Sequence, residues 1–314
     1  MIDIIKYSPE HKGIWNEFVE SSKNGTFLFN RDYMDYHSHR FHDNSYLIYR
    51  KNKLYALLPA NIREDVIYSH QGLTYGGLIM GEKCSSEGVL EVFAELLWKL
   101  KSEHISRLVY KPVPSLYHKY PSDEDLYALF RNNAVLTVRN ISSTLPLDHP
   151  YRFNKDRREA VRRAIHNGVT VENSTNFPDF WRILEGNLMS TYGAKPVHTL
   201  SEIQSLVQLF PNKIQLWCAF KDGSMIGGMV CYNFPTAIHA QYISASPEGK
   251  KYGAVDLIVH HILNNAHKEK KDLRWFDLGT SNEDGGRILN ESLVYQKEGF
   301  GGRGICYDTY EVKL

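Results

Sequence analysis

Residues 214–233 read IQLWCAFKDGSMIGGMVCYN, and this stretch decides the expected fold of the second half of the chain. Two apolar runs, residues 214–220 and 225–233, flank the pair Asp222-Gly223. An Asp-Gly pair between two such runs is a strong signal for a β-hairpin, because both residues tolerate a positive φ. The sequence therefore predicts two antiparallel strands joined by a tight turn.

A strand, a helix and another strand are expected after this hairpin. Residues 236–245 (TAIHAQYISA) and 273–280 (LRWFDLGT) have the composition of strands. The segment between them has one apolar face at helical spacing, formed by Val255, Ile258, Val259, Ile262, Leu263 and Ala266. A short helix that ends at Gly299 and a last strand at 304–314 complete the order.

The first half of the chain repeats this order at an offset of roughly 160–171 residues. Its hairpin has strands at 45–50 and 53–62. The later elements are a strand running into a Gly-rich loop at 65–80, a helix from Val89 to Leu100, a strand at 106–113, a short helix at 123–133 and a last strand at 134–147. We therefore expect an α+β fold of two similar tandem domains, 1–148 and 149–314, with mixed, mostly antiparallel sheets.

Composition and charge limit the classes of function. The chain has 314 residues, of which 42% are hydrophobic, and a net charge of +1, so a strongly basic nucleic-acid-binding molecule is not indicated. There is no signal-peptide pattern and no apolar run of the roughly 20 residues that span a bilayer. The four cysteines lack CxxC spacing, so neither a metal site nor disulfides are expected. These features predict a reduced, cytoplasmic protein.

Three stretches of the second half carry a family resemblance. They are FNKDRREAVRRAIHNGVTV (153–171), FDLGT (276–280) and YQKEGFGGR (295–303). Together with the repeated element order, they resemble the tandem GNAT acyltransferases of the Fem-like superfamily, which includes the aminoacyl transferases that branch peptidoglycan in bacteria. The resemblance implies two GNAT-like (acyl-CoA N-acyltransferase) domains that meet at the polar residues 148–150, and N-acyl transfer to an amine of a cell-envelope precursor, such as an aminosugar or a peptide.

Two departures from the family stand beside this resemblance. The long paired-helix arm of the Fem proteins has no counterpart here. The acyl-CoA loop of GNAT enzymes has the pattern Arg/Gln-x-x-Gly-x-Gly/Ala, and this chain has Lys250-Lys251-Tyr252-Gly253-Ala254-Val255, in which Val255 replaces the last small residue. The departure at Val255 argues against ordinary CoA binding, and the neutral overall charge argues against extensive tRNA binding. The GNAT resemblance implies acyl-CoA as co-substrate, with aminoacyl-tRNA as the alternative.

The candidate catalytic residues are Lys297, Tyr295 and His239. The resemblance implies that Lys297 stabilises the oxyanion or phosphate of the acyl donor, and that Tyr295 protonates the departing thiolate. Residues two apart do not face the same point on a regular helix, so the two roles conflict. Strand alternation places His239 on one face with Gln241, where an imidazole base would meet the attacking amine. The alternatives are a helix-end lysine and a hydrogen-bonded sheet histidine.

The turn after Lys297 holds three glycines, at positions 299, 301 and 302. We expect Gly299 to end the helix, in the left-handed conformation if it is a C-cap. Phe300 is expected to pack into the second domain, and Arg303 to contact the substrate. Asp277 lies where the family has an acidic residue at a strand end, and it is a further candidate for substrate binding.

Two basic segments are candidates for phosphate binding. Gly249, Lys250, Lys251 and Gly253 precede a helix and could hold the pyrophosphate of CoA, although Ser246 and Pro247 also fit an ordinary helix start. The helix after residue 152 carries Arg152, Lys155, Arg157, Arg158, Arg162 and Arg163. Arg158 and Arg162 are one turn apart and are predicted to bind phosphates of a lipid-linked or nucleotide-linked acceptor, or of tRNA, unless the cluster is a solvated face.

Further substrate contacts are predicted in two loops. In the first half, YSHQGLTYGG (68–77) places His70, Gln71 and Tyr75 beside glycines. In the second half, Lys195 belongs to a loop that is expected to cover the acceptor. The partners implied are a small-molecule or lipid-linked envelope precursor and tRNA, with peripheral contact to a membrane. A ligand-binding protein that kept the fold without the chemistry is the rival interpretation.

Overall fold

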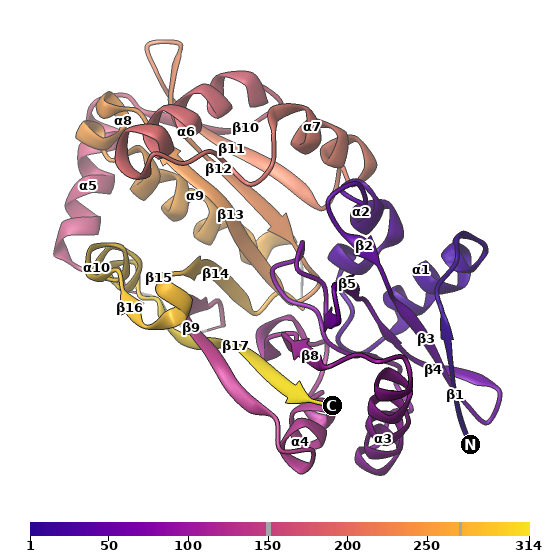
Figure 1. Cartoon of the computed structure of the whole chain (residues 1–314). Helices are drawn as coiled ribbons and strands as arrows, with labels where there is room; N and C mark the ends of the chain where they lie inside the picture. Colours follow the sequence, from indigo (N-terminus) through magenta and orange to yellow (C-terminus); the bar gives the residue numbers. More distant parts are fainter. Residues whose placement is uncertain (149–151, 270–271) are drawn as a thin grey trace. The chain divides into compact units, whose positions relative to one another are not determined.

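The structure is a computed structural model that describes residues 1–148, 152–269 and 272–314 (Figure 1). Contacts within the chain divide it into two compact units. Unit 1 consists of Met1–Ile141, Asn282–Ile288 and Cys306–Leu314, and unit 2 of Ser142–Ser281 and Leu289–Ile305. Each unit combines helices with mostly antiparallel sheets, which confirms the predicted α+β class.

Unit 1 contains two groups of paired strands. The first is a sheet of order β1-β3-β4-β7, formed by Ile2–Lys6, Tyr46–Arg50, Lys53–Leu58 and Ile79–Met80. The second has the order β17-β8-β6-β5-β2, formed by Arg303–Lys313, Arg107–Tyr110, Val66–Tyr68, Asn61–Arg63 and His42–Asp43. Its helices are α1 (Lys12–Ser21), α2 (Arg31–Asp35), α3 (Ser86–Ser102) and α4 (Glu124–Arg131). The core lies between α3 and the strands, around Phe93, Leu96 and Tyr110.

Unit 2 is built on strands of order β10-β11-β12-β13-β14-β9. They are Thr170–Ser174, Ile214–Lys221, Ser224–Asn233, Ala237–Ala245, Trp275–Thr280 and Val135–Pro146. The helices are α5 (Lys155–His166), α6 (Phe177–Tyr192), α7 (Leu200–Leu209), α8 (Pro247–Tyr252), α9 (Ala254–Glu269) and α10 (Glu291–Gly299). A short ribbon of β15 (Asn282–Glu283) and β16 (Ile288–Leu289) precedes α10 in the chain, and all of it except Leu289 belongs to unit 1.

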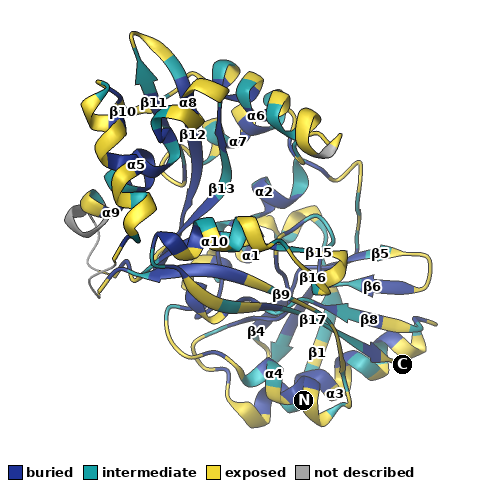
Figure 2. Cartoon of the chain, turned by 90° about the vertical axis from the view of Figure 1, so that its left-hand side faces the viewer, coloured by how far each residue is buried: buried dark blue, intermediate teal, exposed yellow. Residues whose placement is uncertain are grey.

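Both faces of the unit 2 sheet are covered by helices. Successive residues of a strand point to opposite faces. Met229 belongs to the core cluster that contains Ile258 and Val259 of α9, whereas the neighbouring Gly228 faces the ring of Phe180 in α6. Strand β12 is consequently buried over most of its length, as Figure 2 shows.

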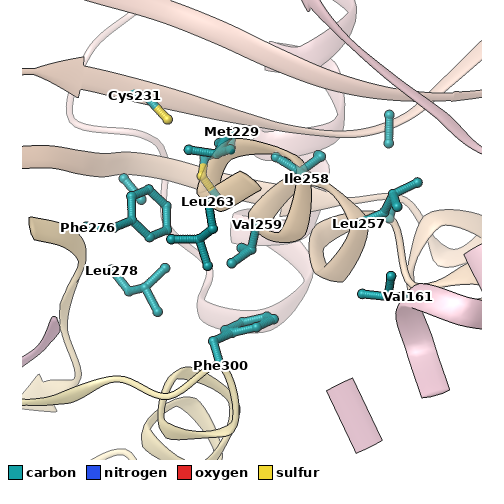
Figure 3. Packing of buried hydrophobic residues seen from close by; sticks show 14 of the residues in the cluster. Val161, Met229, Cys231, Leu257, Ile258, Val259, Leu263, Phe276, Leu278 and Phe300 are labelled. Atoms are coloured by element: carbon teal, nitrogen blue, oxygen red, sulfur yellow. The ribbon is translucent and has the colours of Figure 1, made fainter. Parts of the chain in front are cut away.

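Phe300 belongs to the core on the α9 face. Only 2% of its surface is exposed, and it packs into the cluster that holds Val259, Leu263 and Leu278 (Figure 3). The predicted anchoring of the glycine-rich turn by this ring is confirmed. The turn therefore brings the end of α10 to a fixed place in unit 2.

The repeat predicted from the sequence is present in both units. Each has a hairpin, β3–β4 and β11–β12, whose turn residues have positive φ, as at Asn52 (59°) and Asp222 (48°). Each also has a parallel ladder of three residue pairs, β6 with β8 and β13 with β14. The long helices α3 and α9 lie between the paired strands in the sequence.

The end of the last strand of each half belongs to the unit of the other half. In β9, the residues Ser142 to Pro146 pair with β14 in unit 2. In β17, the residues Tyr310 to Lys313 pair with β8 in unit 1. A cut of the sequence after Asp148 therefore does not coincide with the two units, because strand hydrogen bonds and not chain order complete each sheet. His149 and Pro150 of the predicted junction lie outside the described residues.

One predicted strand is divided in the structure. The run 53–62 forms β4 and β5, which belong to different groups of strands. Pro59 lies between them, and a proline lacks the N–H that a continuous strand would donate. The chain thus leaves one sheet and enters the next at this residue.

Candidate active site

Strands β13 and β14 part in the middle of unit 2. Their parallel ladder runs from Ala237↔Trp275 to His239↔Asp277, and both strands continue beyond it, to Ala245 and Thr280. Backbone groups beyond the end of a ladder need other hydrogen-bond partners. The residues at this point are the candidate active site.

His239 and Asp277 form a buried pair at the end of the ladder. The imidazole Nδ1 of His239 lies 2.7 Å from Oδ2 of Asp277 and donates to it, because a carboxylate only accepts. The other oxygen, Oδ1, accepts from the hydroxyls of Ser142 and Thr144, and from the backbone N–H of Gly279 at 3.1 Å. These donors fix the carboxylate, and through it the orientation of His239.

Asp277 has no exposed surface. The prediction that it contacts a substrate does not fit this burial. Its carboxylate instead contacts His239, which is 9% exposed. With the proton on Nδ1, the basic lone pair of the imidazole is on Nε2.

Lys297 of α10 reaches the same strand end. Its Nζ donates to the carbonyl oxygens of Gly279 and Thr280, each at 2.8 Å. Burial lowers the pKa of Lys297 to about 8, and the charge of Asp277 opposes part of that shift. The two accepting carbonyls belong to β14 and not to the end of α10. The alternative of a helix-end lysine that interacts with the dipole of its own helix therefore does not explain this contact.

Gly279 links the histidine and the lysine. A Cβ added to this glycine would lie 3.6 Å from Cε1 of His239, and the carbonyl of the same residue binds Lys297. The structure thus brings together two of the three predicted catalytic residues. A basic imidazole and a buried ammonium beside one backbone segment can deprotonate an amine and stabilise a developing oxyanion.

Gln241 does not share the face of His239 by simple alternation. The pairing of β12 with β13 shifts register, since Val230 pairs with Tyr242 and Cys231 with Ala240. Gln241 is the extra residue of this β-bulge. Tyr242 pairs with Val230 on the face of His239, so simple alternation does not hold along this strand, and the contact of Gln241 with a substrate stays a prediction.

Tyr295 and Arg303 lie apart from the buried pair. Tyr295 is 59% exposed, and its hydroxyl donates to Asp156 at 2.8 Å, which raises the pKa of Tyr295. Its position agrees with the expected conflict between Tyr295 and Lys297 on one helix. Arg303 is exposed and donates to the carbonyl of Gly302.

The glycine turn after α10 differs in one detail from expectation. Helix α10 ends at Gly299, as predicted, but Gly299 does not have a positive φ; Gly301 does, at 101°. Gly299 is instead limited by space, because a Cβ there would lie 2.9 Å from Nδ2 of Asn154. The left-handed position of the turn is therefore two residues further along.

Gly301→Ala is expected to lower the free energy of unfolding by about 1–3 kcal/mol, because an alanine at this φ is strained. Gly186→Ala, inside α6 with open space around the added Cβ, is the matched control and should raise stability by about 0.5–1 kcal/mol. Urea unfolding followed by circular dichroism measures both changes. Equal stabilities of the Gly301→Ala variant and the wild type would show that the turn relaxes without strain.

The predicted pyrophosphate loop is a short helix. Ser246 caps α8 by accepting from the N–H of Gly249 at 3.1 Å, which matches the ordinary helix start. A Cβ at Gly249 would lie 1.9 Å from the carbonyl oxygen of Ile226, and one at Gly253 would lie 2.7 Å from that of Ala160. Packing within the protein thus accounts for both glycines.

The lysines of this segment point to protein neighbours or solvent. Lys250 donates to Oδ1 of Asn187 at 3.0 Å, and Lys251 lies beside the ring of Tyr252. Lys195 is an exposed loop residue between α6 and α7. The structure leaves their predicted ligand contacts untested.

Arg158 and Arg162 are exposed on α5 and line one cavity. The cavity has a volume of about 430 Å³ and belongs to unit 2. The predicted shared face of these two arginines is therefore present.

The predicted loop residues of unit 1 have partners within that unit. Gln71 accepts from the amide of Asn61 at 2.8 Å, and the buried Tyr75 donates to the hydroxyl of Thr26 at 3.3 Å. Burial lowers the pKa of His70 to about 3, so this histidine is neutral. Contact of these residues with a substrate remains a prediction.

Sequence reasoning missed three polar residues. Ser142 and Thr144 bind Asp277 across 135 and 133 positions of sequence, and no local pattern signals such a pairing. In unit 1, Lys111 donates to the carbonyl of Leu73, and burial lowers the pKa of Lys111 to about 8. A lysine directly after a buried strand was the available signal for Lys111.

None of the helices within the described ranges has both the length and the apolar character that crossing a bilayer requires.

Comparisons with known proteins identify the domain and the fold. Residues 152–285 match the model of the acetyltransferase (GNAT) domain. No curated protein matches the sequence.

Three solved structures cover nearly the whole chain. FemX is 11% identical with a TM-score of 0.71, covering 99% of this chain and 97% of its own. The C-terminal domain of a putative lysylphosphatidylglycerol synthetase from Agrobacterium fabrum is 11% identical with a TM-score of 0.62, and the similarity covers 97% of this chain and 92% of that domain's chain. A tandem GNAT protein from the clavulanic acid biosynthesis pathway is 11% identical with a TM-score of 0.56, and the similarity covers 100% of this chain and 98% of that protein's chain. Residues 152–285 are thus similar to a GNAT acetyltransferase domain, and the chain as a whole shares its fold with FemX and with the tandem GNAT protein.

Proposed function

We propose that this protein is an N-acyltransferase that acylates an amine of a cell-envelope precursor, an aminosugar or a peptide. The observation that carries the proposal is the grouping of His239, Asp277 and Lys297 at the end of the β13–β14 ladder. FemX and lysylphosphatidylglycerol synthetase, whose structures are similar, support an envelope precursor as the acceptor.

The chemistry begins with the amine. An ammonium group does not attack a carbonyl until it loses a proton, and Nε2 of His239 is the base that accepts it. Asp277 stabilises the imidazolium that forms. The amine nitrogen then bonds to the acyl carbon, and the bond from that carbon to the leaving group breaks.

Lys297 is suited to the charge that develops on the acyl oxygen. Its ammonium has three N–H donors, and two are held by the carbonyls of Gly279 and Thr280. The third can donate to the oxyanion. Because the two carbonyls hold the group in place, little reorganisation is needed when the charge appears.

The donor is proposed to be acyl-CoA, with aminoacyl-tRNA as the second candidate. Gly249 and Gly253 pack closely against the protein's own backbone. Their lack of a side chain is therefore explained without a bound CoA pyrophosphate. The similarity to FemX and to lysylphosphatidylglycerol synthetase supports an aminoacyl donor. The two donors differ in the leaving group and not in what Lys297 and His239 do.

Mass spectrometry of the purified protein with each donor tests the proposal. The protein is incubated with acetyl-CoA or with a charged tRNA mixture, in the presence of aminosugar and peptide amines. An amine that gains an acyl or aminoacyl mass, with stoichiometric loss of the donor, is the expected result. Donor that is bound and recovered unchanged with every amine would instead support the non-catalytic interpretation.

A further inference from the structure

The cavity on α5 has a charged rim and an apolar floor. Arg152, Arg158, Arg162 and His260 line it together with Phe153 and Val161. Phe153 and Val161 are 6% and 7% exposed, and both belong to the core cluster of unit 2, in which Figure 3 places Val161 at the margin. At about 430 Å³, the cavity has the size of a small-ligand pocket.

The positive charges of α5 fall into two groups. Arg157 pairs with Asp256 at 3.0 Å, and Lys155 lies 3.9 Å from Glu159. In the part of the chain that the structure describes, no carboxylate pairs with the arginines at positions 152, 158 and 162. Arg152, just before α5, and Arg158 and Arg162 on the helix line the cavity without an acidic partner, and Arg158 also donates to the carbonyl of Phe153. Arg163 has no carboxylate partner among the described residues either, but it does not line the cavity.

The larger cavity of unit 1, at about 710 Å³, differs in this respect. Its Arg50 makes two hydrogen bonds with Glu91, and Glu82 is part of the lining. Acidic groups thus offset part of the positive charge there. In the α5 cavity, the lining contains three arginines and no acid.

His260 adds a polar group without a fourth charge. Its Nε2 lies 2.9 Å from the amide nitrogen of Asn264 and accepts from it, so the imidazole carries its proton on Nδ1. Burial lowers the pKa of His260, which favours this neutral form. The rim therefore offers guanidinium groups and a neutral imidazole.

We propose that this cavity binds an organic phosphate, with the phosphate held by Arg152, Arg158 and Arg162 and the apolar part of the ligand against Phe153 and Val161. Guanidinium groups match the geometry of phosphate oxygens and remain charged at all relevant pH values. The apolar lining by Phe153 and Val161 favours a ligand with an organic part over inorganic phosphate. Nucleotides and lipid phosphates share the required chemistry.

The inference deepens the proposed function, because it gives the acceptor or donor a phosphate group. It rests on that function only for the role of the ligand, and not for its binding. Binding can be measured without turnover. A protein that binds organic phosphates but transfers no acyl group would contradict only the proposed function, and one that transfers without this binding would contradict only the cavity.

Isothermal titration calorimetry of the full chain provides the test, with inorganic phosphate, adenosine diphosphate and dihexanoylphosphatidic acid as probes. We expect saturable binding of at least one organic phosphate, at least about tenfold tighter than inorganic phosphate. The probe that binds more tightly identifies a nucleotide or a lipid as the source. Absence of saturable binding of all three at millimolar concentration, or equal affinity for inorganic phosphate, would overturn the proposal.

Variants locate the binding. Arg152→Gln combined with Arg162→Gln should weaken the organic phosphate at least about tenfold. Arg163→Gln, an exposed arginine of the same helix that does not line the cavity, is the charge-matched control and should stay within about twofold. Val161→Thr should reduce the preference for organic over inorganic phosphate. Equal losses in the Arg163→Gln control would show diffuse attraction to α5 and contradict a defined cavity.

Discussion

Lys297→Met is expected to reduce kcat by at least about 100-fold, which corresponds to about 2.7 kcal/mol in the barrier. Methionine keeps the length and helix propensity of the side chain but cannot donate to the oxyanion. Turnover is measured in the assay that identifies the donor. The control is Lys213→Met, which removes one exposed lysine before β11 and should leave kcat unchanged.

The Lys297→Met variant also tests how the free energy of unfolding depends on pH. The pKa of Lys297 is lowered from 10.5 to about 8, so the folded protein carries a charging penalty below pH 8 that disappears between pH 8 and pH 10.5. The stability of the wild type relative to Lys297→Met should therefore rise over this range, by at most about 3 kcal/mol. Lys111, whose pKa is lowered similarly, is present in both proteins and cancels.

These two measurements separate a catalytic lysine from a structural one. Urea unfolding at pH 7 and near pH 9.5 gives the stability difference, and steady-state kinetics gives the effect on turnover. A folded Lys297→Met protein with near-wild-type kcat would show that Lys297 only ties α10 to β14. A pH-independent stability difference would show that the ammonium is better solvated than its contacts indicate.

Asp277→Asn is expected to lower kcat by about 100-fold or more, with a smaller effect on KM. An asparagine fills the same volume but cannot stabilise an imidazolium, and its amide does not dictate which nitrogen of His239 carries the proton. The buried carboxylate touches no substrate, so its effect should fall on turnover. Asp222→Asn, in an exposed turn where asparagine is equally suited, serves as the control.

Nitrogen-15 NMR of the imidazole gives a readout that a purely structural role of Asp277 would not change. Wild-type His239 should be protonated on Nδ1, as its contact with Asp277 requires. Asp277→Asn should mix the two tautomers. The Nδ1–H form at unchanged population in the variant, or its absence from the wild type, would contradict the positioning of His239 by Asp277.

The order of the elements could be predicted from local patterns. Turn pairs such as Asp222-Gly223 and the apolar face of α9 depend on residues close in sequence, and these features were found where expected. Helix α6 was not predicted, although its capping residue Asn176 and its Pro178 are ordinary signals of a helix start. Helix α6 lies before the hairpin β11–β12 and therefore outside the repeated order of elements.

The candidate site was predictable only in part. His239 and Lys297 were found from their residue types and from the family resemblance. The hydroxyls of Ser142 and Thr144 reach Asp277 through the pairing of β9 with β14, which the chain order conceals. Similarly, a single extra residue in β13, Gln241, breaks the strict alternation from which its shared face with His239 was predicted, and no sequence signal marks such a bulge.

The exchange of last strands has a consequence for biosynthesis. Residues Cys306–Leu314 are made after all of unit 2, yet they pair with β8 in unit 1. One edge of β8 therefore stays unpaired while residues 142–305 are translated. An open strand edge is a site for unwanted association, so during synthesis unit 1 depends on residues 306–314 to cover this edge.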